Sequence, residues 1–309
     1  MSSIEKIWSR VLDCNVNSLY EVTEMVLRDF TTQIELLQPS GFSYNGSEEK
    51  RCVVFNGENW LIKEQKYNWN NVLSEYVASS VIRCLGGNSH ITKLIQNDNK
   101  LVVACKDFTS VTGNYSTLGT VWESSIDTDT ANHEYFIEDI IYELQCLLKG
   151  DSTDVVSQFM RMYVYDTILA NPDRHKYNWG FYRANGVWRL TPIYDNGASL
   201  LPRASFENHT KDWWRERIYV FPNSKIMFNK EKRCSNYYEV WSSDYLPKPI
   251  VDWARNICIE DALVWIDSNP LLSYEMKRFY SMLISMRFRC IIRFEDFDNV
   301  YKETCGRYY

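Results

Sequence analysis

Three polar residues near the middle of the chain have the types and spacing that phosphoryl transfer requires. Asp173 and Asn178 lie five positions apart in a polar stretch, and Asp195 follows after an intervening strand-like segment. Phosphoryl transfer needs one carboxylate that accepts the proton of the attacking hydroxyl, and two oxygen ligands that hold Mg²⁺ against the phosphates. We therefore interpret Asp173 as the proton acceptor and Asn178 and Asp195 as the metal ligands.

A lysine and a glutamate upstream fit a second part of the same chemistry. Lys63 ends the apolar run Trp60-Leu-Ile-Lys63, and Glu75 comes twelve residues later in a segment with helical spacing. A lysine on a central strand can hold the α- and β-phosphates of a nucleotide when a helix carboxylate positions its ammonium. The sequence thus predicts that these two residues form an ion pair.

The elements that must carry the lysine and the glutamate can be predicted from periodicity. After two short helices near the N-terminus, strand-like residues flank Asn56-Gly57 and predict a β-hairpin, because both turn residues tolerate positive φ. A helix is predicted over 70–85, with Gly86-Gly87 as its stop signal. Two further strands are predicted over 91–95 and 101–105.

The second part of the chain is predicted to be mainly helical. Residues 109–134 are rich in Ser, Thr, Asp, Asn and Gly, which is typical of a loop or of the junction between two lobes. Amphipathic spacing predicts a helix over 137–148, and a helix over 154–169 is apolar on most sides and therefore buried. A hairpin around Asn185-Gly186 then separates the two proposed metal ligands and could bring them together.

Long helical segments are predicted near 250–266 and 272–294. We interpret the arginines at positions 287, 289 and 293 as a solvated face of the second segment. The order along the chain is therefore a small strand-rich part followed by a larger helical part. A cleft between two such lobes is a natural place for a ligand.

Composition and charge exclude several classes of protein. With 34 basic and 40 acidic residues in 309, the net charge of −6 supplies no basic face for nucleic acid. The nine cysteines are widely spread without a Cys-x-x-Cys pair, so we expect them to be reduced and not to bind metal. No apolar run is long enough for a membrane span and no signal peptide is visible, which predicts folding in a cytoplasm.

The segments around the three central polar residues resemble the HipA-like serine/threonine kinase family. Kinases of that family have a catalytic loop Asp-x-His-x-x-Asn and a metal-binding aspartate after Pro-x-Tyr or Pro-x-Phe. The corresponding segments here are Asp173-Arg-His175-Lys-Tyr-Asn178 and Pro192-Ile-Tyr-Asp195. Within the family the likeness is nearest to the short, cell-translocating kinase A type, through Ser74-Glu-Tyr-Val-Ala78, Val102-Val-Ala-Cys-Lys-Asp-Phe-Thr109, Asn178-Trp-Gly-Phe181 and Arg217-Ile-Tyr-Val-Phe-Pro222.

The resemblance, which extends from about residue 40 to 225, implies a fold and a function. The expected fold is α+β and protein-kinase-like, with an N-lobe over 1–108 and a helical C-lobe over 109–309. The expected reaction uses ATP and Mg²⁺ to phosphorylate a Ser or Thr hydroxyl of a protein substrate. The resemblance also implies an antitoxin or a host protein as partner, and translocation to a host cell.

A loop before the first strand resembles the phosphate-contacting loop of the same family. The family pattern is Ser-x-x-Gly-x-Gln-x-Lys, and the sequence here is Ser43-Tyr-Asn-Gly46-Ser-Glu-Glu-Lys50, with Glu48 in place of the glutamine. The likeness implies that Gly46, Ser47 and Lys50 contact the phosphates. It also implies that Ser43 is a site of autophosphorylation.

The segment 103–108 is interpreted as the hinge between the lobes, because it follows two strands and precedes a polar stretch. The main-chain groups of Ala104, Cys105 and Lys106 would then face the adenine, with Phe108 beside them. A plain edge strand is the alternative interpretation of this segment.

His175, the two adjacent tryptophans and the function of the whole chain each have more than one interpretation. His175 could act as a general base, but we favour a role in shaping the catalytic loop. Trp213 and Trp214 could form a platform for the acceptor, but adjacent tryptophans are more often packed in a core. For the whole chain, the alternatives are a catalytically silent nucleotide-binding module that docks on a partner, and a kinase for a small-molecule or lipid hydroxyl.

Overall fold

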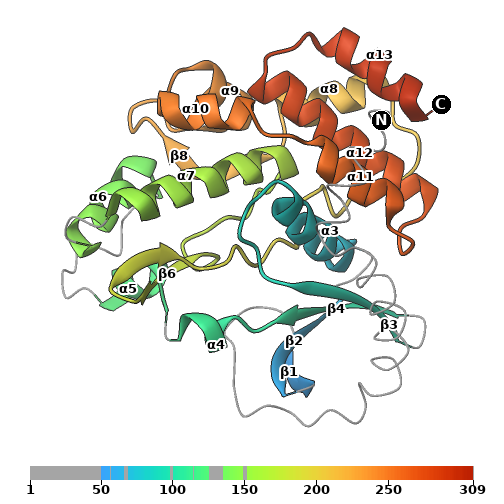
Figure 1. Cartoon of the computed structure of the whole chain (residues 1–309). Coiled ribbons are helices and arrows are strands. Elements are labelled where there is room, and N and C mark those ends of the chain that lie inside the picture. The colour runs from blue at the N-terminus through green and yellow to red at the C-terminus, as the bar shows by residue number, and fades with distance from the viewer. Residues whose placement is uncertain are drawn as a thin grey trace, which may run out of the picture.

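A computed structural model describes most of the chain from Lys50 onward. The residues it describes are 50–55, 57–65, 69–97, 100–113, 115–124, 135–148 and 152–308. The two predicted N-terminal helices lie outside the described residues. Figure 1 shows a small strand-rich lobe below a larger helical lobe, with helix α3 (Asn71–Cys84) between them.

An antiparallel sheet of four strands forms the small lobe within the described residues. Its strands β1 (Lys50–Phe55), β2 (Glu58–Glu64), β3 (Thr92–Asn97) and β4 (Lys100–Lys106) are arranged in the order β1-β2-β4-β3. The predicted β-hairpin is confirmed, because β1 pairs with β2 across a turn in which Gly57 has a φ of +75°. Glycine adopts this left-handed conformation without the steric cost that a side chain brings.

Helix α3 agrees closely with the helix predicted over 70–85. Its apolar side chains, among them Val77 and Val81, are fully buried, and the helix packs against β3, β4 and helix α11 (Glu260–Ser268). The helix stops as predicted, because Gly86 has a φ of +80° and turns the chain back toward the sheet. Through its contact with α11, helix α3 connects the sheet to the helical lobe.

The segment 109–134 was interpreted as a loop or as the junction between two lobes, and the interpretation as a loop was wrong in part. Among its described residues, the structure has helix α4 (Thr109–Thr112), strand β5 (Ser116–Thr117) and helix α5 (Leu118–Ser124). Strand β5 pairs with β6 (Gly180–Ala184), which is remote in sequence. A two-residue strand has no periodicity of its own, so only this distant partner stabilises it.

The central helices and the second hairpin lie close to their predicted positions. Helix α6 (Ile137–Leu148) and helix α7 (Ser152–Leu169) match the two predicted helices. Strand β6 continues into β7 (Val187–Leu190) through a turn in which Asn185 and Gly186 have φ values of +51° and +80°. Two successive positive φ values are the geometry for which an Asn-Gly pair is suited.

The rest of the helical lobe surrounds α7. Its elements are α8 (Lys211–Tyr219), β8 (Asn223–Phe228), β9 (Cys234–Asn236), α9 (Tyr237–Ser242), α10 (Lys248–Arg255), α11, α12 (Tyr274–Arg287), the π-helical turn η3 (Phe288–Ile292) and α13 (Phe297–Tyr308). The predicted helix near 250–266 is two helices, α10 and α11. The predicted helix near 272–294 is α12 continued by η3.

The expectation of a solvated arginine face was wrong for Arg287. Its side chain is fully buried, with Nε 2.6 Å from the carbonyl oxygen of Thr167 and Nη1 2.9 Å from that of Arg217. Burial lowers the pKa of Arg287 to about 10, although the rings of Tyr237 and Tyr163 oppose this shift. Helical periodicity could not reveal this contact, because the two carbonyl groups belong to α7 and α8.

Helix α7 lies at the centre of the core, as its apolar sequence predicted. It contacts α6, α10, α12 and β7, and Phe159, Tyr163 and Ile168 on it are fully buried. A helix packed on several sides holds its C-terminal end firmly, and the loop with Asp173 begins at that end. In the part of the chain that the structure describes, no helix combines the length and the apolar composition needed to cross a membrane.

Candidate active site

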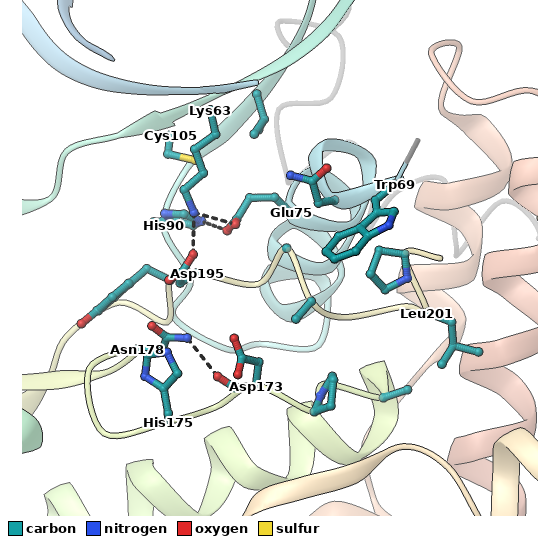
Figure 2. A pocket seen from close by; sticks show the side chains of 18 of the residues that line it. Lys63, Trp69, Glu75, His90, Cys105, Asp173, His175, Asn178, Asp195 and Leu201 are labelled. Carbon is teal, nitrogen blue, oxygen red and sulfur yellow. Dashed lines mark hydrogen bonds and ion pairs between the residues drawn. The ribbon is translucent and has the colours of Figure 1, made fainter. Parts of the chain in front are cut away.

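A cleft with a volume of about 1800 Å³ contains the predicted chemistry-bearing residues (Figure 2). The predicted site residues that line it are Lys63, Glu75, Cys105, Lys106, Phe108, Asp173, His175, Asn178 and Asp195. They come from the sheet, from α3, from the loop after α7 and from the segment after β7. The fold thus brings together side chains as far apart in sequence as Lys63 and Asp195, which are separated by 132 positions.

The register of the sheet decides which strand residues face this cleft. Leu61 pairs with Cys105 and Lys63 pairs with Val103, and all four side chains line the cleft. Because side chains alternate between the faces of a sheet, Ala104 points the other way and is buried in a separate small apolar cluster. Of the predicted hinge residues, Ala104 therefore does not line the cleft.

The chain leaves the sheet at Lys106 and continues along the wall of the cleft. The amide of Lys106 donates a hydrogen bond of 2.8 Å to the carbonyl oxygen of Ile91, so this group is used by the protein itself. Phe108 packs its ring 5.4 Å from those of Tyr115 and Tyr194, measured between ring centroids. This aromatic contact joins the end of the sheet to the segment that contains Asp195.

The predicted ion pair between Lys63 and Glu75 is present and has a third member. The Nζ atom of Lys63 lies 2.8 Å from Oε2 of Glu75 and 2.7 Å from Oδ1 of Asp195. Burial by itself would lower the pKa of Lys63, but the two carboxylates outweigh it and raise that pKa well above its usual value. Lys63 is therefore a fixed cation between the sheet, α3 and the segment after β7.

Glu75 is held from two further directions. Its Oε1 atom accepts a hydrogen bond of 2.9 Å from the main-chain amide of Asn196 and lies 2.9 Å from Nε2 of His90. Burial would raise the pKa of Glu75, but the Lys63 ammonium and the contact with His90 hold that pKa well below its usual range. With both oxygens occupied, the carboxylate stays ionised and can adopt only one orientation.

The loop after α7 fixes Asp173 and Asn178 relative to each other. The amide of Asp173 donates to Oδ1 of Asn171 over 3.0 Å, and Nδ2 of Asn178 donates to the carbonyl oxygen of Asp173 over 2.9 Å. Because the amide nitrogen of Asn178 is used in this way, its Oδ1 atom remains as an acceptor. The Asp173 carboxylate makes no hydrogen bond or ion pair with any residue that the structure describes, and it faces the cleft in Figure 2.

A buried arginine ties this loop to the segment with Asp195. Nη1 of Arg174 donates to the carbonyl oxygens of Asn178 and Tyr194 over 2.8 and 2.6 Å, and Nη2 donates to Oδ1 of Asn196 over 2.7 Å. Burial would lower the pKa of Arg174, but the carboxylate of Asp166 outweighs it and raises the pKa. One guanidinium group therefore sets the separation of the two segments on which the proposed metal ligands lie.

Asn178 and Asp195 have the chemistry that a Mg²⁺ site requires. An amide oxygen and a carboxylate are the hard oxygen ligands that this ion prefers. Asn178 is buried, whereas the Asp195 side chain is 32% exposed and reaches into the cleft. The backbone of Asp195 has a φ of +59°, a strained value that its surroundings must enforce. The residues present thus fit a bound divalent cation.

His175 lies beside Asp173 in the same loop. Its main-chain amide donates to the carbonyl oxygen of Asp173 over 2.8 Å, and its Nδ1 atom accepts a longer hydrogen bond of 3.3 Å from the amide of Tyr177. Both bonds lie within the loop. They agree with the interpretation in which His175 shapes the loop.

Several predicted residues cannot be placed. Ser43, Gly46 and Ser47 lie outside the described residues, and Lys50 is described only as the first backbone position of β1. The phosphate-contacting loop therefore stays a prediction.

Residues that the sequence interpretation did not name connect the predicted ones. Asp166 binds Arg174, Arg174 binds Asn196, Asn196 binds Glu75, and His90 contacts the same glutamate. Each neighbouring motif offered a weak signal. Arg174 follows the proposed proton acceptor directly, Asn196 follows the proposed metal ligand, and Asp166 is a carboxylate near the C-terminal end of an apolar helix.

Comparison with known proteins places the chain in a family. The profile of the HipA-like C-terminal domain family matches residues 42–234, which is more than half of the chain. The chain belongs to this family. The HipA-like chain is also 29% identical over 279 residues to the serine/threonine-protein kinase CtkA of Helicobacter pylori, and the alignment covers 84% of each protein.

Solved structures agree with this assignment. The HipA-like chain is similar to the crystal structure of the Helicobacter pylori proinflammatory kinase CtkA, with a TM-score of 0.69 and 26% identity, covering 87% of this chain and 96% of that one. It shares a fold with HipA of Shewanella oneidensis, with a TM-score of 0.52 and 13% identity, covering 89% and 72% of the two chains. The expected protein-kinase-like α+β fold is confirmed, and the chain is a HipA-like kinase.

Proposed function

We propose that this HipA-like kinase transfers the γ-phosphoryl group of ATP to a Ser or Thr hydroxyl of a protein, with Mg²⁺ as the metal. The observation that carries the proposal is the arrangement around Lys63. Its ammonium is paired with Glu75 and Asp195, while the carboxylate of Asp173, which has no partner among the described residues, faces the same cleft. A fixed cation at one side and a carboxylate at the other are what a bound triphosphate and its acceptor need.

The nucleotide lies between the two lobes in this proposal. Lys63 binds the α- and β-phosphates, and Glu75 keeps its ammonium in place. The adenine lies against the segment from Cys105 to Phe108, which lines the cleft. Gly46, Ser47 and Lys50 cover the phosphates. We propose that the lobes meet at residue 108, where the chain leaves the sheet.

The proposed metal ligands are Asn178 and Asp195. A bound Mg²⁺ supplies positive charge that neutralises the phosphate oxygens. The Nδ2 hydrogen bond to the Asp173 carbonyl orients the amide oxygen of Asn178 for this purpose. Asp195 contacts Lys63 through Oδ1, and a carboxylate with two oxygens can bind a metal ion as well as this ammonium.

Asp173 accepts the proton of the acceptor hydroxyl. Its carboxylate lies in the cleft without a competing partner among the described residues, and the loop fixes its backbone on both sides. His175 acts as a positioning residue through its hydrogen bond to the Asp173 carbonyl. A positioned carboxylate of this kind contributes about 10²- to 10⁴-fold to a reaction that involves proton transfer.

Incubation with labelled ATP and Mg²⁺, followed by mass spectrometry, tests the proposal. We expect phosphate on Ser or Thr residues of the protein itself or of an added acceptor. Asp173→Asn should lower incorporation by about a hundredfold or more while nucleotide affinity, measured by calorimetric titration, stays nearly unchanged. Asp261→Asn is the matched control, because Asp261 is exposed on α11 and does not line the cleft.

Three outcomes would contradict the proposal in whole or in part. Normal incorporation by Asp173→Asn would remove the assignment of the proton acceptor. Nucleotide binding without transfer to any hydroxyl would favour a silent docking module, and transfer to small molecules or lipids alone would change the acceptor class.

A further inference from the structure

The cleft continues beyond the proposed reaction centre to helix α8 and strand β8. The side chains that line this extension are Arg203, His209, Trp213, Arg217, Phe221 and Lys225, and we call it the α8 groove. None of them has a role in the proposed nucleotide and metal chemistry. Because the extension is continuous with the cavity at Asp173, it lies where the substrate that supplies the hydroxyl must enter.

The charge of the α8 groove differs from that of the reaction centre. Arg203, Arg217 and Lys225 bring positive charge to it. The carboxylates among the described lining residues are Glu75, Asp107, Asp173 and Asp195, and none of them comes from α8 or β8. In a protein with a net charge of −6, this is a local concentration of cations that the overall charge does not explain.

Helix α8 builds one wall of the α8 groove as an ordered stack. The ring of His209 lies parallel to that of Trp213, with centroids 3.7 Å apart, and the guanidinium of Arg217 lies 5.0 Å from the Trp213 ring and 5.8 Å from the Phe221 ring. Trp213, Arg217 and Phe221 are spaced by four positions, which places them along one side of α8 and the residues that follow it. The interpretation of the two tryptophans as packed residues holds for the buried Trp214 and in part for Trp213, which is half-buried against the same core and also lines the groove.

The same wall is accessible to a ligand. Phe221 is 47% exposed, which is unusual for a large aromatic side chain, and Arg203 and Lys225 are exposed as well. Arg217 is paired with its neighbour Glu216 through Nη1 over 2.9 Å, but the Glu216 side chain is 48% exposed and does not line the groove. An exposed pair of this kind is weak. A guanidinium group has five N–H donors, so Arg217 can bind a ligand in addition to Glu216.

We infer that the α8 groove binds the protein segment that contains the acceptor hydroxyl, and that it selects segments with aspartate or glutamate near that hydroxyl. This inference rests on the proposed kinase function. The three cations attract the carboxylates, while the exposed ring of Phe221 offers apolar surface to the rest of the segment. The stack is formed before the ligand arrives, so little side-chain conformational freedom is lost on binding.

Three synthetic peptides test the inference on the full-length chain. Each contains a single serine, flanked by glutamates, by glutamines or by lysines. Their binding is measured by fluorescence anisotropy with a non-hydrolysable ATP analogue and Mg²⁺ present, and their phosphorylation is measured with labelled ATP. The glutamate peptide should bind most tightly and the lysine peptide least. Binding of the glutamate peptide should weaken as salt is added, because salt screens exposed charges.

A pair of double variants with equal changes in net charge shows where the peptide binds. Arg217→Gln with Lys225→Gln should weaken binding of the glutamate peptide by about tenfold and hardly affect the glutamine peptide. The control combines Arg215→Gln and Lys230→Gln. Arg215 lies on α8 and pairs with Asp298, Lys230 pairs with Asp139, and neither lines the cleft. The control should bind the glutamate peptide as the unchanged protein does, and thermal unfolding confirms that both variants are folded.

The outcomes separate the inference from the proposed function. Equal affinity for the three peptides, no measurable binding of any of them, or equal weakening by the two double variants would overturn the inference. Phosphorylation without a charge preference would keep the kinase and remove the acidic selectivity. Binding of the glutamate peptide that depends on Arg217 and Lys225, with no phosphate transfer at all, would keep the α8 groove and contradict the proposed reaction.

Discussion

Arg174 and Asp166 form a fully buried, two-point ion pair beside the loop that contains Asp173. Nε of Arg174 lies 2.9 Å from Oδ2 of Asp166, and Nη2 lies 3.0 Å from Oδ1. The carboxylate belongs to the last turns of α7, and the arginine directly follows Asp173. The pair therefore anchors the loop of the proposed proton acceptor to helix α7, which is packed on several sides.

Breaking this pair should strongly destabilise the protein. We expect Arg174→Met to lower the free energy of unfolding by about 3–5 kcal/mol, because the buried Asp166 carboxylate loses its counter-charge. Urea unfolding followed by circular dichroism measures the change. Arg215→Met, which removes an exposed partner of Asp298, is the control and should change the stability by less than about 1 kcal/mol. Similar changes in the free energy of unfolding for the two variants would show that the buried pair contributes no more to stability than the exposed pair does.

Removal of the Lys63 ammonium should weaken nucleotide binding. Lys63→Met keeps most of the side-chain volume but leaves the phosphates without a charged donor, and we expect about a tenfold to hundredfold loss of affinity for ATP with Mg²⁺. Calorimetric titration measures the affinity. Lys248→Met is the control, since this lysine on α10 has a side chain that is 83% exposed. Unchanged affinity in Lys63→Met would contradict the phosphate-binding role.

The burial of His90 should make stability depend on pH. Burial is the main cause that lowers the pKa of His90 below its usual 6.5, and the nearby Lys63 and Arg83 act in the same direction, although Glu75 opposes the shift. Below pH 6.5 the unfolded chain then binds a proton more readily than the folded protein does. Stability is therefore fully present above that pH and is lost as the pH falls.

The variant His90→Gln tests this dependence. It retains a hydrogen-bond donor but cannot titrate, so its unfolding midpoint in urea should change less between pH 6.5 and the ordinary pKa of Glu75, 4.5, than that of the unchanged protein. Glu75, whose pKa is lowered, contributes stability that is lost only at more acidic pH, in both proteins. Parallel pH profiles of the two proteins would rule out His90 as the source of the dependence.

Gly180 should tolerate no side chain. A Cβ atom at this position would lie 2.6 Å from the backbone oxygen of Ser116, the residue with which β5 starts its pairing with β6. We expect Gly180→Ala to separate these strands and to lower the melting temperature by several degrees. Gly306→Ala is the matched control, because a Cβ there meets no atom within 4 Å on helix α13 and should stabilise the protein by about 1 kcal/mol. A melting temperature of Gly180→Ala equal to that of the unchanged protein would show that β5 and β6 accommodate the added Cβ atom without a loss of stability.

The sequence by itself determined the elements with strong local signals. The hairpin around Gly57, the helix with Glu75 and helix α7 could be predicted because apolar periodicity and turn residues act over a few neighbouring positions. The types and spacing of Asp173, Asn178 and Asp195 likewise indicated one kind of chemistry. What could not be predicted locally, such as β5 and the buried Arg287, depends on partners from distant parts of the chain.

Only the tertiary structure decided how the polar residues are connected. Sheet register turned Cys105 toward the cleft and Ala104 away from it, and a shift by one residue would have reversed both. The bonds from Arg174 through Asn196 to Glu75 cross between segments that have no local relation in sequence. Hydrogen bonds and ion pairs act over a few ångströms of space, so their partners follow from the packed fold and cannot be read from spacing along the chain.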